Sequence, residues 1–210
     1  LHFSTVDVYG YPSLPCAENA ALSATPFAYG ESKRQAEQLL QRYAQTHGVA
    51  YTIVRPGNVI GPGSQFIQRI GEALDHGLML RIDKGQANAG LVYIDNLVEY
   101  VISLANSADA SGQVFNLRDP YDVNWARFVN DLRRGIAGKG RVLDLPFWLA
   151  AAVAQVLQAL YRGLRIGREP LLHPLIVNMF GKTCGHSAEK LHSLCQIDQL
   201  VGYEEAMQRS

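Results

Sequence analysis

The most constraining feature of this sequence is a succession of short β-branched runs separated by segments with helical periodicity. Apolar runs occupy Leu1–Val8 and Val49–Val54. Between them, Thr25-Pro26 marks a helix start, and the helical pattern of Ala28–Thr46 ends at Gly48. A strand, a crossover helix and a second strand of these lengths predict parallel strands with helices on the faces of the sheet. The pattern therefore predicts an α/β fold.

Further elements of the same kind follow along the chain. Helical periodicity predicts a helix at Gln65–His76. The apolar run Leu91–Ile94 predicts a strand that leads into a helix at Asp95–Asn106, and Val114–Leu117 predicts another short strand. These elements extend the alternating pattern toward the second half of the chain.

Charge and cysteine content exclude several classes of function. The 210 residues contain 19 basic and 19 acidic side chains, so no overall field favours nucleic acid, and 48% hydrophobic content predicts a soluble globular protein. The cysteines, Cys16, Cys184 and Cys195, are widely spaced and form no Cys-x-x-Cys pair. This spacing argues against a disulfide framework and against a zinc site, so we expect no metal and a reducing, cytoplasmic setting.

The most apolar stretch, Leu145–Leu160, allows two interpretations. It contains two glutamines and is shorter than the roughly 20 residues that a spanning helix needs. The favoured interpretation is a core helix or a helix at a homodimer interface. The alternative is peripheral contact with a membrane through residues 145–168, because Arg162, Arg165 and Arg168 follow the apolar run at three-residue spacing.

Tyr29 and Lys33 form the clearest chemical pair in the sequence. They are four residues apart at the start of the predicted helix, and this spacing places them on one helix face. A tyrosine ordinarily ionises at about pH 10, but a neighbouring ammonium favours the phenolate and makes the phenol a usable proton donor or acceptor. Proton transfer of this kind accompanies hydride transfer at a carbinol. Such a pair also occurs by chance on helix surfaces, so its context decides.

The context is supplied by two strands that end in polar residues. Ser4 and Thr5 lie in the second half of the first run, and Pro56 and Asn58 follow the second. Ligand crevices of parallel sheets lie beyond the carboxyl ends of the strands, so we expect these residues to meet the Tyr29 helix in one crevice. A purely structural role, as a strand residue for Thr5 or a turn-former for Asn58, is the competing interpretation.

Taken together, these motifs resemble those of the extended short-chain dehydrogenase/reductases, which include sugar-nucleotide epimerases and dehydratases and 3β-hydroxysteroid dehydrogenase-like enzymes. The resemblance runs nearly end to end. Its motifs, in chain order, are Thr5 before Tyr9-Gly10, Tyr29-x-x-x-Lys33, Arg55 to Pro62, Val92 to Asn96, Gly112 to Asn116 and Val201 to Glu205.

The resemblance implies roles for the candidate residues. Tyr29 would be the general acid/base, Thr5 would hold the reacting oxygen, and Lys33 would lower the Tyr29 pKa and bind the nicotinamide ribose. The other implied contacts are Pro56 to the cofactor, NAD or NADP, and Ser4 and Asn58 to a small-molecule substrate.

The resemblance also implies the domain organisation: the carboxyl-terminal part of a Rossmann-type doubly wound parallel sheet with a smaller mixed substrate-binding domain. Residues 1–60 would form the second half of the nucleotide-binding domain, and 61–210 mainly the substrate-binding region, with 91–118 partly returning to the Rossmann domain. The chain contains no Gly-x-x-Gly-x-x-Gly turn to hold a pyrophosphate. We therefore expect the amino-terminal part of the family's fold to be missing and Leu1–Ser210 alone to be inactive and to bind cofactor poorly.

One departure from the family bears on the substrate. Sugar-nucleotide members commonly carry Arg-Asp, whose arginine can clamp a diphosphate, where this chain has Ala89-Gly90. The expected substrate is therefore a lipophilic secondary alcohol or ketone, sterol-like or terpenoid. A sugar-nucleotide epimerase or dehydratase, with Arg81 or Arg118 as the clamp, is the first alternative. A non-catalytic binding protein that retains the fold is the second.

Overall fold

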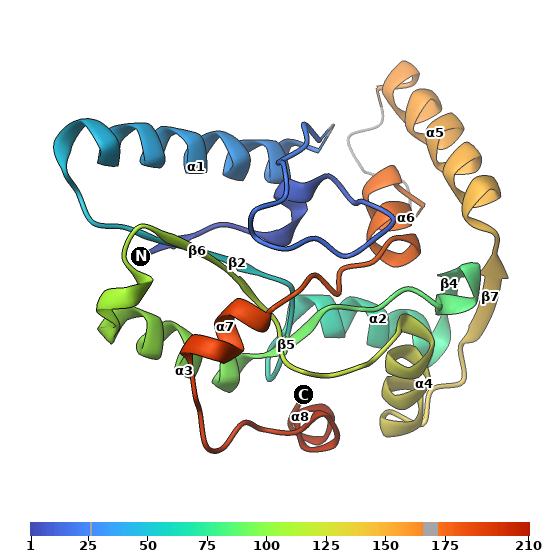
Figure 1. Ribbon diagram of the computed structural model, residues 1–210. Coiled ribbons are helices and arrows are strands. Elements are labelled where there is room, and N and C mark those ends of the chain that lie inside the picture. The colour runs from blue at the N-terminus through green and yellow to red at the C-terminus, as the bar shows by residue number, and fades with distance from the viewer. Residues whose placement is uncertain (26, 166–171) are drawn as a thin grey trace.

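A parallel sheet flanked by helices forms one half of the molecule in the computed structural model, which describes residues 1–25, 27–165 and 172–210 (Figure 1). Its strands are β1 (His2–Phe3), β2 (Thr52–Pro56) and β6 (Gln113–Leu117), in the order β1-β2-β6. Both pairings are parallel, with Phe3 opposite Val54 and Val54 opposite Phe115. The predicted α/β fold with parallel strands is confirmed.

Two long helices cover opposite faces of this sheet. Helix α1 (Ala28–His47) lies on one side, and α3 (Ile94–Asn106), with α7 (Glu189–Leu194), lies on the other (Figure 1). Helix α1 ends where its sequence predicts, because Gly48 adopts φ +64° and its N–H bonds to the Ala44 carbonyl. Apolar side chains of β2, β6 and α3 form the core here: Val54, Leu97, Tyr100, Leu104, Phe115 and Leu117.

The other half of the molecule contains two small parallel sheets and five helices of the described chain. The sheets pair β3 (Asn58–Ile60) with β5 (Leu91–Tyr93) and β4 (Leu78–Ile82) with β7 (Arg141–Leu145). The helices are α2 (Gln65–His76), α4 (Trp125–Gly135), α5 (Phe147–Gly163), α6 (Pro174–Gly181) and α8 (Tyr203–Arg209). Their core is aromatic, since the Trp125 ring packs 4.3 Å from Phe180 and 5.9 Å from Phe128 between centroids.

Two boundaries at the start of the chain differ from prediction. The expected strand Leu1–Val8 stops at Phe3, because the Thr5 hydroxyl accepts the Asp7 N–H at 3.3 Å and caps a 3₁₀ helix, η1 (Val6–Tyr9). Helix α1 begins at Ala28 rather than at Thr25-Pro26. The Thr25 hydroxyl accepts the Phe27 N–H at 3.3 Å just before the helix, and Pro26 lies outside the described residues.

The predicted helix in the apolar stretch is present as α5, which covers most of Leu145–Leu160. Residues 166–168 of the arginine-bearing segment lie outside the described residues. Within the described chain, no helix combines the length and the hydropathy required to cross a bilayer.

Candidate active site

Thr5 and Tyr29 come together where β1 ends and α1 begins. Thr5 lies two residues beyond β1, and Tyr29 is the second residue of α1. Gly30 allows the helix to approach η1 closely, because a Cβ at this position would lie 2.9 Å from Thr25 Cγ2 and 3.2 Å from Asp7 Cβ. The Thr5 and Tyr29 hydroxyl groups are thereby brought close enough to interact. Thr5 is buried, whereas 56% of Tyr29 is exposed.

The Tyr29 pKa is shifted in the direction opposite to the one expected. Partial burial raises the pKa of the phenol, the negative charge of Asp7 raises it further, and the nearby Thr5 hydroxyl opposes both. Lys33 does not lower it, since its Nζ donates to the Phe3 carbonyl at 2.8 Å and lies 5.9 Å from the centre of the Tyr29 ring. Tyr29 is therefore a protonated phenol at neutral pH.

Two neighbouring groups of the site were missed in the sequence. Burial raises the pKa of Asp7, in η1, and the nearby Tyr11 hydroxyl partly opposes that shift. The Tyr11 backbone has φ +60°, and its ring packs edge-on against Phe27 at 5.8 Å. Both residues sit within a stretch whose apolar pattern reads as strand and turn. The one sequence signal for this part of the site was Asp7, an acidic residue near the end of the apolar run Leu1–Val8.

The remaining predicted site residues have different surroundings. The Asn58 amide donates to the Ala89 carbonyl at 2.6 Å, and its backbone N–H donates to the Gly90 carbonyl at 2.9 Å, which favours the structural interpretation of Asn58. Pro56 ends β2 and is half-buried. Ser4 is buried, and its hydroxyl has no partner among the described residues.

A buried ion pair holds the site elements against the sheet. Arg55 on β2 and Glu37 on α1 are joined by two hydrogen bonds, Nε to Oε1 at 3.0 Å and Nη2 to Oε2 at 2.7 Å. Arg55 Nη1 also donates to the Tyr9 hydroxyl at 2.8 Å, and that hydroxyl donates to Asn116 at 2.8 Å. The network therefore connects α1, which carries Tyr29, and η1, which is capped by Thr5, to strands β2 and β6.

Ala89 and Gly90, which stand where a diphosphate clamp would lie, are packed against other parts of the protein. Ala89 is fully buried in the apolar core. Gly90 has φ +58°, and a Cβ there would lie 2.1 Å from the Cys184 carbonyl oxygen. Of the substitute clamps, Arg81 forms two hydrogen bonds with Asp144 at 2.6 and 2.9 Å. Arg118 donates to the carbonyls of His186 and Tyr121, at 3.1 and 3.2 Å, respectively.

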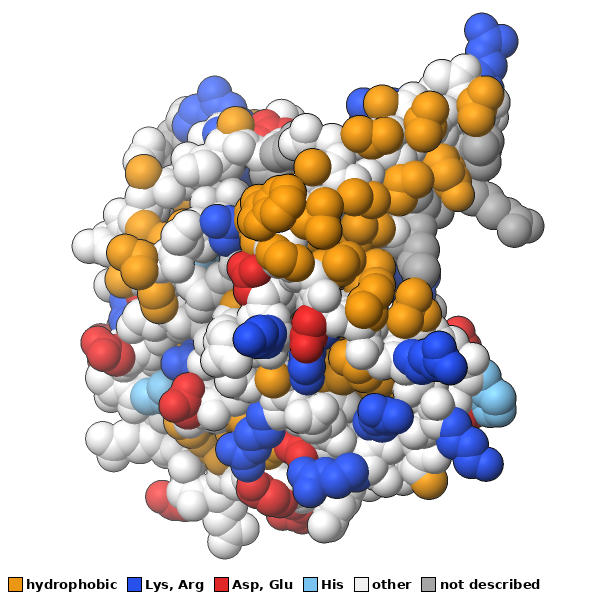
Figure 2. Space-filling model, turned by 90° about the vertical axis from the view of Figure 1, so that its right-hand side faces the viewer, with side chains coloured by type: hydrophobic (Ala, Val, Ile, Leu, Met, Phe, Trp, Pro, Cys, Tyr) orange, Lys and Arg blue, Asp and Glu red, His pale blue; other side chains and the backbone are white. Residues whose placement is uncertain are grey.

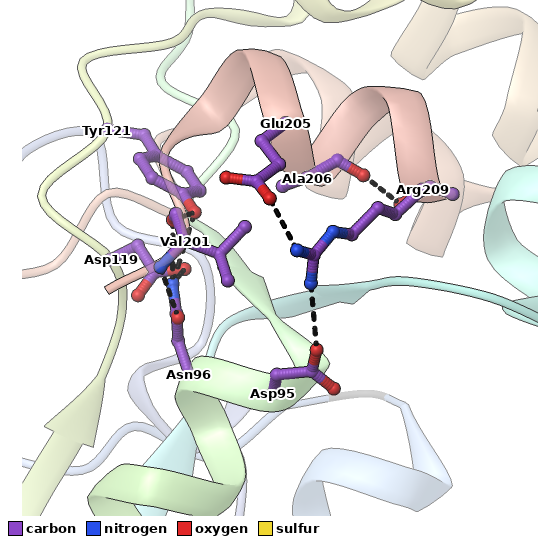
Figure 3. Close-up of polar contacts among 9 residues, drawn as sticks. Asp95, Asn96, Asp119, Tyr121, Val201, Glu205, Ala206 and Arg209 are labelled. Carbon is purple, nitrogen blue, oxygen red and sulfur yellow. Dashed lines mark hydrogen bonds and ion pairs between the residues drawn. The ribbon is translucent and has the colours of Figure 1, made fainter. Parts of the chain in front are cut away.

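Two sequence motifs that lie far apart along the chain meet in a structural contact (Figure 3). The Asn96 amide donates to the Val201 carbonyl at 3.0 Å and accepts the Val201 N–H at 2.8 Å. Buried Asp119 accepts from Asn96 as well, at 3.0 Å. The neighbouring Asp95 makes no cap hydrogen bond to α3 and pairs with Arg209 at 3.5 Å. These motifs therefore attach α8 to α3.

Known proteins with similar sequences include enzymes of two substrate types. A UDP-glucose 4-epimerase of Vibrio cholerae is 31% identical over 129 residues, which cover 57% of this chain and 37% of that protein. A 4-hydroxy-2-methyl-3-oxo-4-farnesyl-3,4-dihydroquinoline-1-oxide ketoreductase of Stigmatella aurantiaca is 30% identical over 170 residues, which cover 78% of this chain and 50% of that protein. The chain thus spans half or less of the length of these two relatives.

Solved structures agree on the fold. A UDP-glucuronic acid 4-epimerase from Bacillus cereus, in complex with UDP-glucuronic acid and NAD, superposes with a TM-score of 0.70 at 17% identity, covering 99% of this chain and 58% of that one. The expected Rossmann-type α/β fold is confirmed. Residues 1–117 match the sequence profile of a family of NAD-dependent enzymes. The chain belongs to the NAD dependent epimerase/dehydratase family.

Proposed function

We propose that this chain carries the proton-transfer site of an NAD(P)-dependent oxidoreductase that acts on a secondary alcohol or ketone. The observation that carries the proposal is the meeting of Thr5 and Tyr29 at the carboxyl end of β1, with Tyr29 accessible from solvent. Ligand sites of parallel α/β folds lie at this edge. Two neighbouring hydroxyl groups can hold one substrate oxygen between them.

In this proposal, the Tyr29 hydroxyl transfers the proton and the Thr5 hydroxyl orients the substrate oxygen. Because the Tyr29 pKa is raised, the phenol is protonated and suited to donate to a carbonyl oxygen as a ketone is reduced. The bound nicotinamide supplies the hydride chemistry. Lys33, whose Nζ donates to the Phe3 carbonyl at the end of β1, and Pro56, at the end of β2, would contact the ribose and nicotinamide end of the cofactor. The unpaired Ser4 hydroxyl would offer a further polar contact.

We propose the same division of labour for the two halves of the chain as the family resemblance implies. Residues 1–60, with 91–118, would lie against the cofactor, and most of 61–210 would bind the substrate. The division places α1 and η1 on the cofactor side of the reacting oxygen. It places α2, β4 and α6 on the substrate side.

A lipophilic substrate is supported by an apolar cavity of ≈ 320 Å³ between α2, β4 and α6. A volume of this size is within the range of small-molecule sites. His173 lines one wall, and its ring lies 6.1 Å from Phe27, two residues before Tyr29. The Stigmatella relative is named as a ketoreductase of a farnesylated quinoline, which is a lipophilic ketone. The other lining residues are Arg69, Ile70, Ala73, Leu78, Met79, Leu80, Ile82, Leu172, Ile176 and Phe180.

The second candidate is a sugar-nucleotide epimerase or dehydratase that uses the same hydroxyl pair. It is favoured by the Vibrio relative, which is named as a UDP-glucose 4-epimerase and is as similar to this chain as the ketoreductase. A diphosphate would need a basic partner other than Arg81 and Arg118, because both guanidinium groups are engaged within the protein. That requirement makes the lipophilic substrate the first choice.

The test uses the full-length protein with NAD and NADP, assayed on lipophilic secondary alcohols and ketones and on UDP-sugars. Tyr29→Phe should abolish turnover with the accepted substrate while cofactor binding persists. Tyr43→Phe is the matched control, since Tyr43 is a 53% exposed tyrosine on the same helix. Near-normal turnover in Tyr29→Phe would end the mechanism, and no turnover of any of these substrates by the parent would favour a binding protein that retains the fold.

A second pair of variants separates substrate class from mechanism. Ile176 lines the cavity and is 37% exposed, so Ile176→Glu should fold normally and raise KM for a lipophilic substrate at least tenfold. Ile102→Glu on α3, at a 50% exposed position away from the cavity, should leave KM unchanged. Turnover of UDP-sugars alone, unaffected by Ile176→Glu, would refute the lipophilic assignment and leave the role of Tyr29 intact.

A further inference from the structure

The exposed face of α5 is apolar along its length. Trp148 is 70% exposed, Val156 59%, Leu160 52% and Leu164 70%. The opposite side of the helix is in contact with the protein, since Ala150 and Ala154 are fully buried. Figure 2 shows hydrophobic side chains gathered over a broad area of this side of the molecule. Such a face is seldom left exposed to solvent, because large exposed apolar patches generally mark a binding surface.

The chain from residue 125 to residue 165, which includes α5, is also strongly basic. Residues 125–165 contain seven basic and two acidic side chains, a formal net charge of +5 in a chain whose total is zero. Both acidic groups are neutralised by arginines, Asp131 by Arg127 and Arg134 and Asp144 by Arg81. No acidic residue occurs between 145 and 165. The basic residues are Arg127, Arg133, Arg134, Lys139, Arg141, Arg162 and Arg165.

We propose that the α5 face, which consists of Trp148, Val156, Leu160 and Leu164 with Arg162 and Arg165 at its end, docks on an anionic lipid bilayer. Helices that lie in the membrane interface combine an apolar face with basic flanks. Tryptophan is enriched at that depth, and arginines near the surface attract acidic lipid headgroups. At 17 residues α5 is suited to lie on the bilayer rather than to span it.

Charge favours a bilayer over a second copy of the chain as the occupant. A two-fold dimer through the α5 face would bring the same surface patch of each copy together. Such an interface would offer Arg162 and Arg165 no acidic partner from the same segment, since no acidic residue occurs between 145 and 165. Unpaired charges at an interface oppose association, whereas an anionic lipid surface neutralises them.

The test measures binding of the full-length protein to vesicles of phosphatidylcholine alone and of phosphatidylcholine mixed with phosphatidylglycerol. We expect binding to the anionic vesicles only, and weaker binding at high salt. The emission of Trp148, obtained as the difference between the parent and Trp148→Phe, should shift to the blue on binding. Trp125 is fully buried and should contribute no change.

Exposed positions provide variants that keep the fold. Leu160→Glu should abolish vesicle binding, and Arg162→Glu should weaken it roughly fivefold or more, since each basic residue near an anionic surface contributes about this factor. Leu39→Glu on α1, at a 63% exposed leucine, is the matched control and should bind as the parent does.

Equal vesicle binding by the parent and Leu160→Glu would overturn the proposal. So would an absence of vesicle binding by the parent. If light scattering then showed a dimer that Leu160→Glu converts to monomer, the α5 face would be assigned to a second copy of the chain. Neither outcome depends on catalysis, so the proposal can fail while the assignment of Tyr29 stands.

Discussion

The buried ion pair between Arg55 and Glu37 should be the main polar determinant of stability around the active site. Both side chains are almost completely inaccessible, at 3% and 1% exposure, and they share two charge-assisted hydrogen bonds. Glu37→Gln keeps the size of the side chain but leaves the Arg55 guanidinium buried without a counter-charge. Removal of one partner from a buried pair typically costs about 3–5 kcal/mol.

The magnitude for Glu37→Gln lies toward the low end of that range, because the glutamine amide oxygen still accepts one of the two Arg55 hydrogen bonds. We expect a loss of about 3 kcal/mol in the free energy of unfolding. For a chain of this size, each kcal/mol changes Tm by about 2–4 °C, so Tm should fall by about 6–12 °C. Because the total free energy of unfolding of a protein is only about 5–15 kcal/mol, this loss is a large fraction of it.

The assay is urea unfolding of the parent, Glu37→Gln and Glu31→Gln, followed by circular dichroism. Glu31 is the matched control, since it lies on the same helix and pairs with Arg34 at 2.6 Å, with both side chains partly exposed. Partly exposed pairs contribute much less than buried ones, so Glu31→Gln should lose far less stability than Glu37→Gln. If Glu37→Gln loses no more stability than Glu31→Gln, the buried network does not hold α1 to the sheet as described.

Three further perturbations test other parts of the structure. Burial lowers the pKa of His186 to about 4, below its ordinary value of 6.5, so the folded state disfavours its charged form. The free energy of unfolding is therefore unaffected by the titration of His186 above pH 6.5 and falls by about 3 kcal/mol as the pH is lowered to about 4. Urea unfolding at a series of pH values should show this loss, and His186→Asn should remove it. Gly90→Ala places a side chain at positive φ against the Cys184 carbonyl and should cost at least about 1–3 kcal/mol; unfolding at the parent midpoint would contradict the close contact. Asn96→Leu removes both hydrogen bonds to Val201, so amide hydrogens of α8 should exchange faster than in the parent, and unchanged protection there would refute its role as the attachment point.

Helices with strong periodicity and clear ends were predicted well from the sequence. The predicted helix at Gln65–His76 has the same bounds in the structure, because Ser64 caps it and Gly77 follows it. The predicted strand Leu1–Val8 was wrong beyond Phe3. There the Thr5 hydroxyl captures a backbone N–H and starts a 3₁₀ turn, a local competition that an apolar pattern does not reveal.

The candidate site was predicted in part. The order of the motifs along the chain was enough to predict that Thr5 and Tyr29 lie side by side, because Thr5 follows a strand and Tyr29 lies in the first turn of the next long helix. The direction of the Tyr29 pKa shift was not accessible, because it depends on burial and on Asp7, whose carboxylate the η1 turn brings close. The pairing of Asn96 with Val201 joins residues 105 positions apart, and local sequence carries no sign of it.

The central claim is that Tyr29 and Thr5 act as one unit on the substrate oxygen, and a single-turnover measurement of nicotinamide absorbance tests it most directly. Full-length protein loaded with cofactor and its accepted substrate would be compared with Tyr29→Phe, Thr5→Val and the double variant. We predict that Tyr29→Phe slows hydride transfer about a thousandfold and that the double variant is scarcely slower than Tyr29→Phe alone. Hydride transfer in Tyr29→Phe at the parent rate, or losses that multiply in the double variant, would contradict the claim.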